Sequence, residues 1–155
     1  MDEWARGELD PQALEVLDRE ECRDLVAAAP VGRIAFCRGD GVPTVLPVNH
    51  VVDAWTVAFR TTFGSKLSAA LLERPVAFEV DGYDERERAG WSVLVRGPAQ
   101  HVTDVALVRR LESMELDVWA DGVQRPRWVR IEMEELTGRR IPAGGDPRVH
   151  RRGRR

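Results

Sequence analysis

From residue 31 onward, apolar side chains alternate with polar ones along several short segments of the chain. A period of two is typical of strands that bury one face, because successive side chains of a strand point to opposite sides. Turn-forming residues separate these segments, as in 38–41 and 53–54. The pattern predicts six strands, over residues 31–37, 42–52, 55–60, 76–81, 91–102 and 127–131. The fifth has a break at Gly97-Pro98, and 136–141 continues the last one after a kink.

Three segments favour short helices instead of strands. Asp18 is a candidate N-cap with Glu21 in the capping-box position, and Pro30 ends this first helix. The other two helices are expected over 65–72 and 103–114. Short connections predict mostly antiparallel strands, so the fold class is mainly β (α+β), a small barrel with helices outside. Such a barrel has no room for a large ligand, which places a binding site on its outer face or at a subunit contact.

The domain organisation follows from the same pattern. Residues 18–141 form one domain, preceded by an acidic extension over 1–17 and followed by a basic tail over 142–155 that we expect to be disordered. The last nine residues carry five arginines, which leaves −8 on the rest once they are subtracted from the net charge of −3. An acidic body argues against a nucleic-acid-binding protein, which would show a basic face.

The remaining bulk properties exclude several further classes. No stretch approaches the roughly 20 apolar residues that span a bilayer, and the N-terminus is too polar for a secretory signal. We therefore expect a cytoplasmic protein without a membrane segment. The two cysteines, Cys22 and Cys37, lack the spacing of a zinc site and are interpreted as half-buried thiols.

The chain has a single lysine, Lys66, which ends the run Arg60-Thr61-Thr62-Phe63-Gly64-Ser65-Lys66 after the third predicted strand. The planar guanidinium of arginine can donate hydrogen bonds to two phosphate oxygens at once, and lysine adds a compact point charge. The hydroxyls of Thr61, Thr62 and Ser65 add donors, and so do the free N–H groups of a helix that begins near Ser65. This run predicts a phosphate site. The alternative is an ordinary strand-to-helix turn with exposed basic residues.

The order of five blocks resembles the pyridoxamine 5′-phosphate oxidase-like family of flavin-binding split β-barrels. The blocks are residues 29–36, 45–50, 59–66, 90–97 and 128–131, and the resemblance covers about 13–141. It implies a six-stranded antiparallel split barrel that forms a homodimer with FMN at the subunit interface. It also implies an FMN-dependent oxidoreductase acting on a small organic acceptor, as in the nitroimidazole-reductase-like branch.

The resemblance assigns roles to residues by position. Arg60, Thr61, Ser65 and Lys66 would hold the phosphate and ribityl chain. The isoalloxazine ring would lie beside Pro47, Val48, Asn49 and His50, while Trp91 and Ser92 of the other subunit would cover the ring or bind its edge. Trp128 would be a further interface or ring neighbour.

Other roles and cofactors stay open on the sequence. Trp91 is alternatively an aromatic residue of the core or of an interface, and His50 is alternatively a structural histidine. Asn49 is alternatively a cap after Pro47. A deazaflavin coenzyme is an alternative to FMN, although its longer anionic tail needs a basic groove beyond Lys66, and residues 67–74 supply only Arg74. A non-catalytic flavin or haem binder is a third reading, in which a histidine would ligate the iron.

Overall fold

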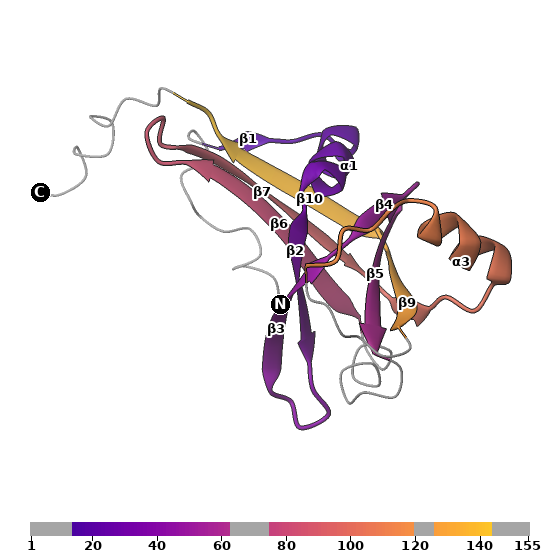
Figure 1. Ribbon diagram of the computed structural model, residues 1–155. Helices are drawn as coiled ribbons and strands as arrows, with labels where there is room; N and C mark the ends of the chain where they lie inside the picture. The colour runs from indigo at the N-terminus through magenta and orange to yellow at the C-terminus, as the bar shows by residue number, and fades with distance from the viewer. Residues whose placement is uncertain (1–13, 63–74, 120–125, 144–155) are drawn as a thin grey trace, which may run out of the picture.

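The computed structural model describes residues 14–62, 75–119 and 126–143. In these ranges the chain forms ten strands and two helices (Figure 1). The helices are α1 (Arg19–Ala28) and α3 (Val105–Glu112). The strands are β1 (Glu15–Val16), β2 (Val31–Cys37), β3 (Pro43–Asn49), β4 (Val51–Asp53), β5 (Thr56–Thr62), β6 (Val76–Asp84), β7 (Ala89–Gly97), β8 (Ala99–His101), β9 (Pro126–Glu132) and β10 (Glu135–Ile141). The helix predicted over 65–72 lies outside the described residues.

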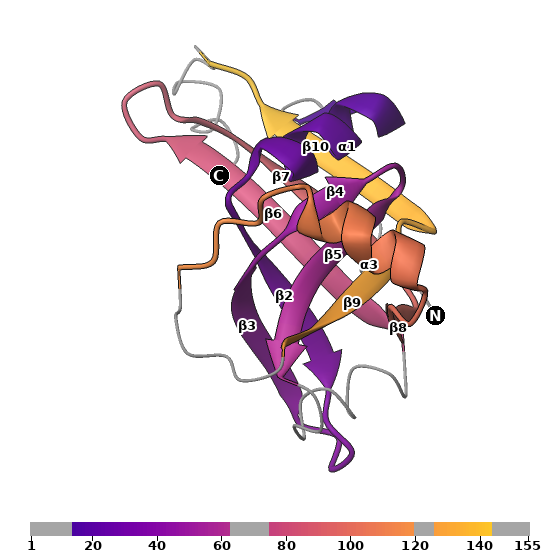
Figure 2. The same cartoon turned by 45° about the vertical axis from the view of Figure 1, so that its right-hand side comes forward.

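The strands form two antiparallel sheets that together make a split barrel. One sheet has the order β1-β10-β7-β6-β2-β3, and the other has the order β4-β5-β9-β8. Figure 2 shows α1 along β10 and α3 beside β5 and β9. The predicted mainly β, antiparallel barrel with helices outside is therefore confirmed. Pro43 and Pro47 lie on β3, which is an edge strand, where a missing N–H is tolerated.

Three of the predicted strands are each divided between the two sheets. The chain leaves the six-stranded sheet at His50, between β3 and β4, and again at Pro98, between β7 and β8. It returns at residues 133–134, between β9 and β10. The sequence predicted the break at Gly97-Pro98 and the kink before residue 136, and both are confirmed as strand ends. The count of six strands was too low because the period of two continues across the corners, so the pattern does not show that the chain changes sheets.

The two corners at Gly97 and Glu132 lie against each other. The backbone N–H of Glu132 donates to the carbonyl of Pro98 over 3.4 Å. A Cβ atom at Gly97 would overlap the carbonyl oxygen of Glu132, so the chain requires glycine at this position. This contact joins the strands that carry most of the apolar core, which includes Val57, Phe59, Phe78, Val95 and Ile131.

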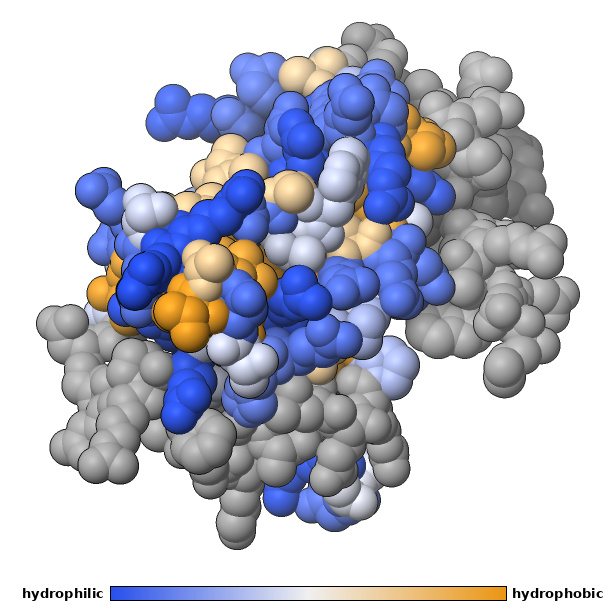
Figure 3. Space-filling view, turned by 90° about the vertical axis from the view of Figure 1, so that its right-hand side faces the viewer, coloured by the Kyte–Doolittle hydropathy of each residue, from blue (hydrophilic) through white to orange (hydrophobic). Residues whose placement is uncertain are grey.

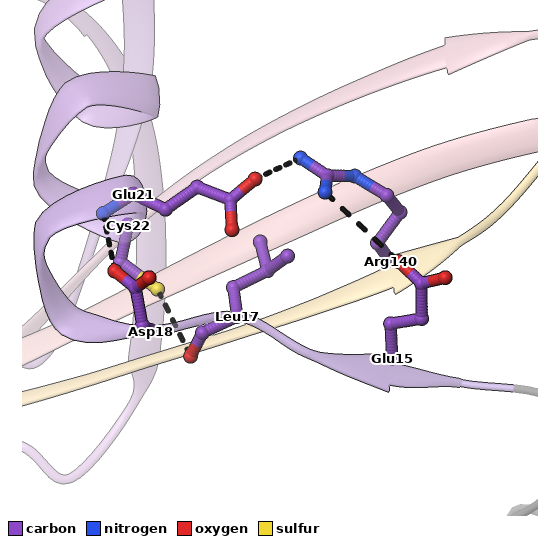
Figure 4. A network of polar contacts seen from close by, with 6 residues as sticks. All are labelled: Glu15, Leu17, Asp18, Glu21, Cys22 and Arg140. Carbon is purple, nitrogen blue, oxygen red and sulfur yellow. Dashed lines mark hydrogen bonds and ion pairs between the residues drawn. The ribbon is translucent and has the colours of Figure 1, made fainter.

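The segment before α1 belongs to the larger sheet (Figure 4). Residues 14–17, which the sequence pattern left in an extension, include strand β1, and Leu17 packs in the core of its own chain. Arg140 of β10 forms an ion pair with Glu21 at 2.5 Å and approaches Glu15 at 4.0 Å. The predicted cap of α1 is confirmed, because the backbone N–H of Glu21 donates to Asp18 over 2.8 Å.

The two thiols differ from the half-buried pair that the sequence suggests. Cys22 is fully buried on α1, against Gly138 of β10, and Cys37 is exposed at the end of β2. Burial raises the pKa of the Cys22 thiol, with the carboxylates of Glu21 and Asp18 acting in the same direction. Cys22 is therefore a packing residue, because the reactive thiolate is disfavoured there.

Candidate functional site

Arg60 lies near the end of β5, on the face of the smaller sheet that α3 covers. The strand alternates, so Val57 and Phe59 enter the barrel core while Ala58 packs with Trp128 beneath α3. Arg60 and Trp128 are cross-strand partners. The guanidinium carbon of Arg60 lies 4.8 Å from the centroid of the Trp128 ring, within the range of a cation–π contact. This contact holds the positively charged guanidinium of Arg60 against the Trp128 ring, near the end of β5.

A cavity of about 490 Å³ opens beside this pair, between β5, β9 and one face of α3. We call it the α3 groove. Strands β5 and β9 contribute Arg60, Arg127 and Trp128, and the segment around α3 contributes Val102, Thr103, Val105, Val108, Arg109 and Glu112. Its size lies within the roughly 300–1,000 Å³ of ordinary ligand sites.

The rest of the predicted phosphate site is only partly described. Ser65, Lys66 and the side chain of Thr62 lie outside the described residues. Thr61 is buried, with 7% of its surface exposed, and does not line the α3 groove. The structure thus brings Arg60 and Trp128 together, while the phosphate roles of the remaining residues stay predictions.

The side chain of Asn49 joins two segments that line a second cavity. The side-chain amide of Asn49 donates to the carbonyl of Pro30 and accepts from the backbone N–H of Trp119, both over 3.0 Å. It therefore holds the loop after α3 against the end of α1, rather than only capping the chain after Pro47. Nearby on β3, Val48 packs against the core and Pro47 is exposed.

His50 is a buried residue at the corner between β3 and β4. Its Nε2 lies 2.7 Å from the carbonyl oxygen of Val26, to which it donates. Its ring meets that of Phe78 edge to face at 4.8 Å. With Nε2 engaged and 7% of its surface exposed, His50 packs as a structural histidine here and offers this nitrogen to no ligand.

Burial lowers the pKa of His50 below its usual 6.5, and this outweighs the carbonyls of Val26 and Val48, which favour the charged ring. The unfolded chain therefore binds the proton more readily than the folded one as the pH falls below about 6.5. We expect the free energy of unfolding to fall there, by at most about 1.4 kcal/mol per pH unit from this group. Urea unfolding at pH 7.5 and 5.5 checks this, with His50→Gln as the comparison. Equal losses in both proteins would contradict it.

Trp91 and Ser92 lie near the start of β7, beside the β6–β7 hairpin. Trp91 packs over Gly82 of β6, where an added Cβ would come within 2.8 Å of the indole. Its ring lines a cavity of about 400 Å³ with Trp119, Pro30, Arg33 and Asp81, which we call the tryptophan cleft. Trp91 and Ser92 also line a third cavity, of about 450 Å³, with Arg139.

The predicted residues thus form two separate groups on one chain. Arg60 and Trp128 line the α3 groove, whereas Trp91 lines the tryptophan cleft, which Asn49 helps to build. Neither cavity contains residues of both groups. Figures 1 and 2 agree that the β6–β7 hairpin and the end of β5 lie at opposite ends of the molecule.

The sequence analysis missed most of the residues that line these cavities, including Trp119, Arg109 and Arg127. Trp119 lies in a segment that carries no periodic pattern. Arg109 has a signal, because Val105, Val108, Arg109 and Glu112 share one helical face at spacings of three and four. Arg127 adjoins Trp128 on β9, but only the fold brings it to α3.

Over the described ranges, no group of His, Cys, Asp and Glu side chains is arranged to hold a metal ion, and no helix there is long and apolar enough to span a membrane.

Comparisons with known proteins agree with this architecture. The family model described as pyridoxamine 5′-phosphate oxidase matches residues 18–140. The uncharacterised protein Rv0080 of Mycobacterium tuberculosis is 39% identical over 132 residues, which cover 82% of this chain and 85% of that protein. A solved structure described as the FAD binding protein from Mycobacterium smegmatis has 38% identity and a TM-score of 0.72, over 83% of this chain and 100% of that one. A FAD-binding protein from Mesorhizobium loti, at 24% identity and a TM-score of 0.67 over 83% and 99% of the chains, has the same fold.

Proposed function

Because the chain belongs to the pyridoxamine 5′-phosphate oxidase family, we propose that it binds a flavin nucleotide and transfers electrons from it to a small organic acceptor. The observation that carries this proposal is Arg60, held over Trp128 at the mouth of the α3 groove, directly before the predicted phosphate run. A flavin nucleotide has an anionic end and a flat ring system, and this arrangement offers a guanidinium beside an aromatic wall. FMN is the smallest ligand that meets these requirements.

A homodimer is the second part of the proposal. Arg60 and Trp91 line separate cavities of one chain, the α3 groove and the tryptophan cleft, which favours a flavin that contacts them from two different subunits. Two copies arranged antiparallel about a twofold axis would bring Arg60 of one subunit beside Trp91 of the other. Each site is incomplete in a single chain, which favours a dimer with two sites.

Different residues of this chain would have different roles at such a site. Arg60, with Lys66, would bind the phosphate and fix the position of the cofactor. Trp91 would cover the ring and exclude water, and Asn49 would keep Trp119 and Pro30 in place at the cleft. The bound flavin would supply the hydride and electron transfer chemistry, and the protein would position it and tune its surroundings.

The purified full-length protein tests the proposal directly. We expect a yellow protein, or a colourless one that gains flavin absorbance on titration with FMN, and a dimer by sedimentation. Mass spectrometry of the released ligand distinguishes FMN, FAD and a deazaflavin coenzyme. A protein that takes up none of the three would contradict flavin binding, and a monomer saturated with flavin would contradict the shared site.

A further inference from the structure

The four tryptophans of the described residues differ in whether a cation covers the ring. Trp55 and Trp128 have arginine guanidinium groups 4.8–5.1 Å from their ring centroids. Trp91 and Trp119 have no such cation within the part of the chain that the structure describes, and both line the tryptophan cleft. The cleft therefore brings together the two indole rings whose faces no arginine of these ranges covers.

Hydrophobic and charged residues lie side by side on this molecule, and Figure 3 shows small groups of hydrophobic residues bordered by hydrophilic ones on the side that carries α3. In the tryptophan cleft the charged part is a cluster of one guanidinium and two carboxylates. Arg33 of β2 forms ion pairs with Asp81 at 2.5 Å and with Glu79 at 3.2 Å, which leaves a net charge of −1 on these three side chains.

The negative charge of this cluster is not balanced from the other side. Arg139 lines the third cavity beside Glu79 and Asp81, but it donates to the carbonyl of Gly138 and, among the described residues, forms no ion pair with either carboxylate. Burial raises the pKa of the Glu79 carboxyl, the carboxylate of Asp81 acts in the same direction, and together they outweigh Arg33. A cation placed near these carboxylates would therefore be stabilised.

Both indole rings of the cleft are held in position by their own chain. The backbone N–H of Trp119 donates to the side-chain oxygen of Asn49 over 3.0 Å, and its indole Nε1 donates to Asp117 over 3.1 Å. Trp91 packs over Gly82. Trp119 is still 64% exposed, so a ligand can reach its ring. A cation within about 6 Å of an indole centroid is attracted by the ring, and rings that are already positioned lose little entropy when it binds.

We propose that the tryptophan cleft binds a flat organic cation of the N-alkylpyridinium type, through its two indole rings and the carboxylate of Asp81. The same class would be the small organic acceptor, and this assignment rests on the proposed function, whereas binding of the cation does not. Uptake of one hydride ion from the reduced flavin turns such a cation into a neutral dihydropyridine, with no proton required. The neutral product loses its attraction to the indoles and the carboxylate, which favours its release.

Three flat bicyclic probes of similar size and different charge test the binding. They are 1-methylquinolinium, which is a cation, quinoline, which is neutral at pH 7, and 1-naphthoate, which is an anion. Calorimetric titration of the full-length protein should show the cation binding at least about 5-fold more tightly than quinoline, with 1-naphthoate the weakest. Equal affinities for the cation and the neutral probe, or a preference for the anion, would overturn the inference.

Matched substitutions locate the site. Trp119→Leu removes the ring but keeps an apolar side chain, and it should weaken 1-methylquinolinium binding about 5-fold to 30-fold, which corresponds to about 1–2 kcal/mol. Trp119→Phe should restore part of the affinity. Trp55→Leu, at a ring that arginines already cover, should change it less than about twofold. Asp81→Asn should weaken binding, whereas Glu135→Gln, in an exposed ion pair with Arg96, should not. Unchanged affinity in Trp119→Leu would overturn the inference.

The flavin-loaded protein tests the assignment of the cation as acceptor. Saturation with 1-methylquinolinium should shift the absorbance of the bound flavin, because Trp91 would border both ligands. Binding of the cation without such a shift, or displacement of the flavin by it, would overturn the acceptor assignment. A protein that binds the cation and takes up no flavin would overturn the proposed function and support the cation site. A protein that binds flavin and no cation would support the proposed function and overturn this inference.

Discussion

Replacing Arg60 and Lys66 together with glutamine is expected to weaken FMN binding by roughly 100-fold to 20,000-fold. Each charge-assisted contact with the phosphate contributes about 1.5–3 kcal/mol, so losing two removes about 3–6 kcal/mol. Arg60 is already positioned for this contact by the Trp128 ring beneath it. Riboflavin, which lacks the phosphate, should lose little affinity in the same variant, and calorimetric titration with both ligands measures the difference.

A matched pair of substitutions separates this effect from a general loss of positive charge. Arg38 and Arg96 lie in exposed ion pairs with Asp40 and Glu135. Arg38→Gln combined with Arg96→Gln removes the same two charges and should leave FMN binding nearly unchanged. If FMN and riboflavin lose affinity equally in the Arg60 and Lys66 variant, these two residues do not bind the phosphate.

Replacing Gly97 with alanine is expected to destabilise the protein by about 3 kcal/mol. The added Cβ would overlap the carbonyl oxygen of Glu132, and backbone atoms cannot move aside as a flexible side chain does. The two corners would have to separate, and with them the strands that enclose the core. Domains of this size have only about 5–15 kcal/mol of stability, so the loss would be a large fraction of the total. Urea unfolding followed by tryptophan fluorescence measures it.

Gly39 provides the control for this substitution. It lies in the turn between β2 and β3, and an added Cβ there meets no atom within 4 Å. Gly39→Ala should therefore change the free energy of unfolding by less than about 0.5 kcal/mol. A Gly97→Ala protein as stable as Gly39→Ala would show that the corners at residues 97 and 132 do not touch in solution.

The sequence predicted the local elements well and the division into sheets poorly. Alternation identified the strands around Val57 and Phe59, and the cap at Asp18 identified the start of α1. The sequence indicated the break at Gly97-Pro98 but not the corner at His50. It also did not show that the chain changes sheets at either position, because a period of two depends only on which face of a strand is buried. The β1 strand was missed because two residues are too short to show a period.

The sequence by itself determined the order of the elements, the family and the basic run that begins at Arg60, since each depends on residue type and spacing along the chain. Only the tertiary structure decided what surrounds that run. Trp128 becomes the neighbour of Arg60 through antiparallel pairing of β5 with β9, and Arg109 reaches the same groove because α3 packs over those two strands. Trp91 lines a separate cavity, the tryptophan cleft, for the same reason. Contacts between residues this distant in sequence depend on strand order and packing, which periodicity does not encode.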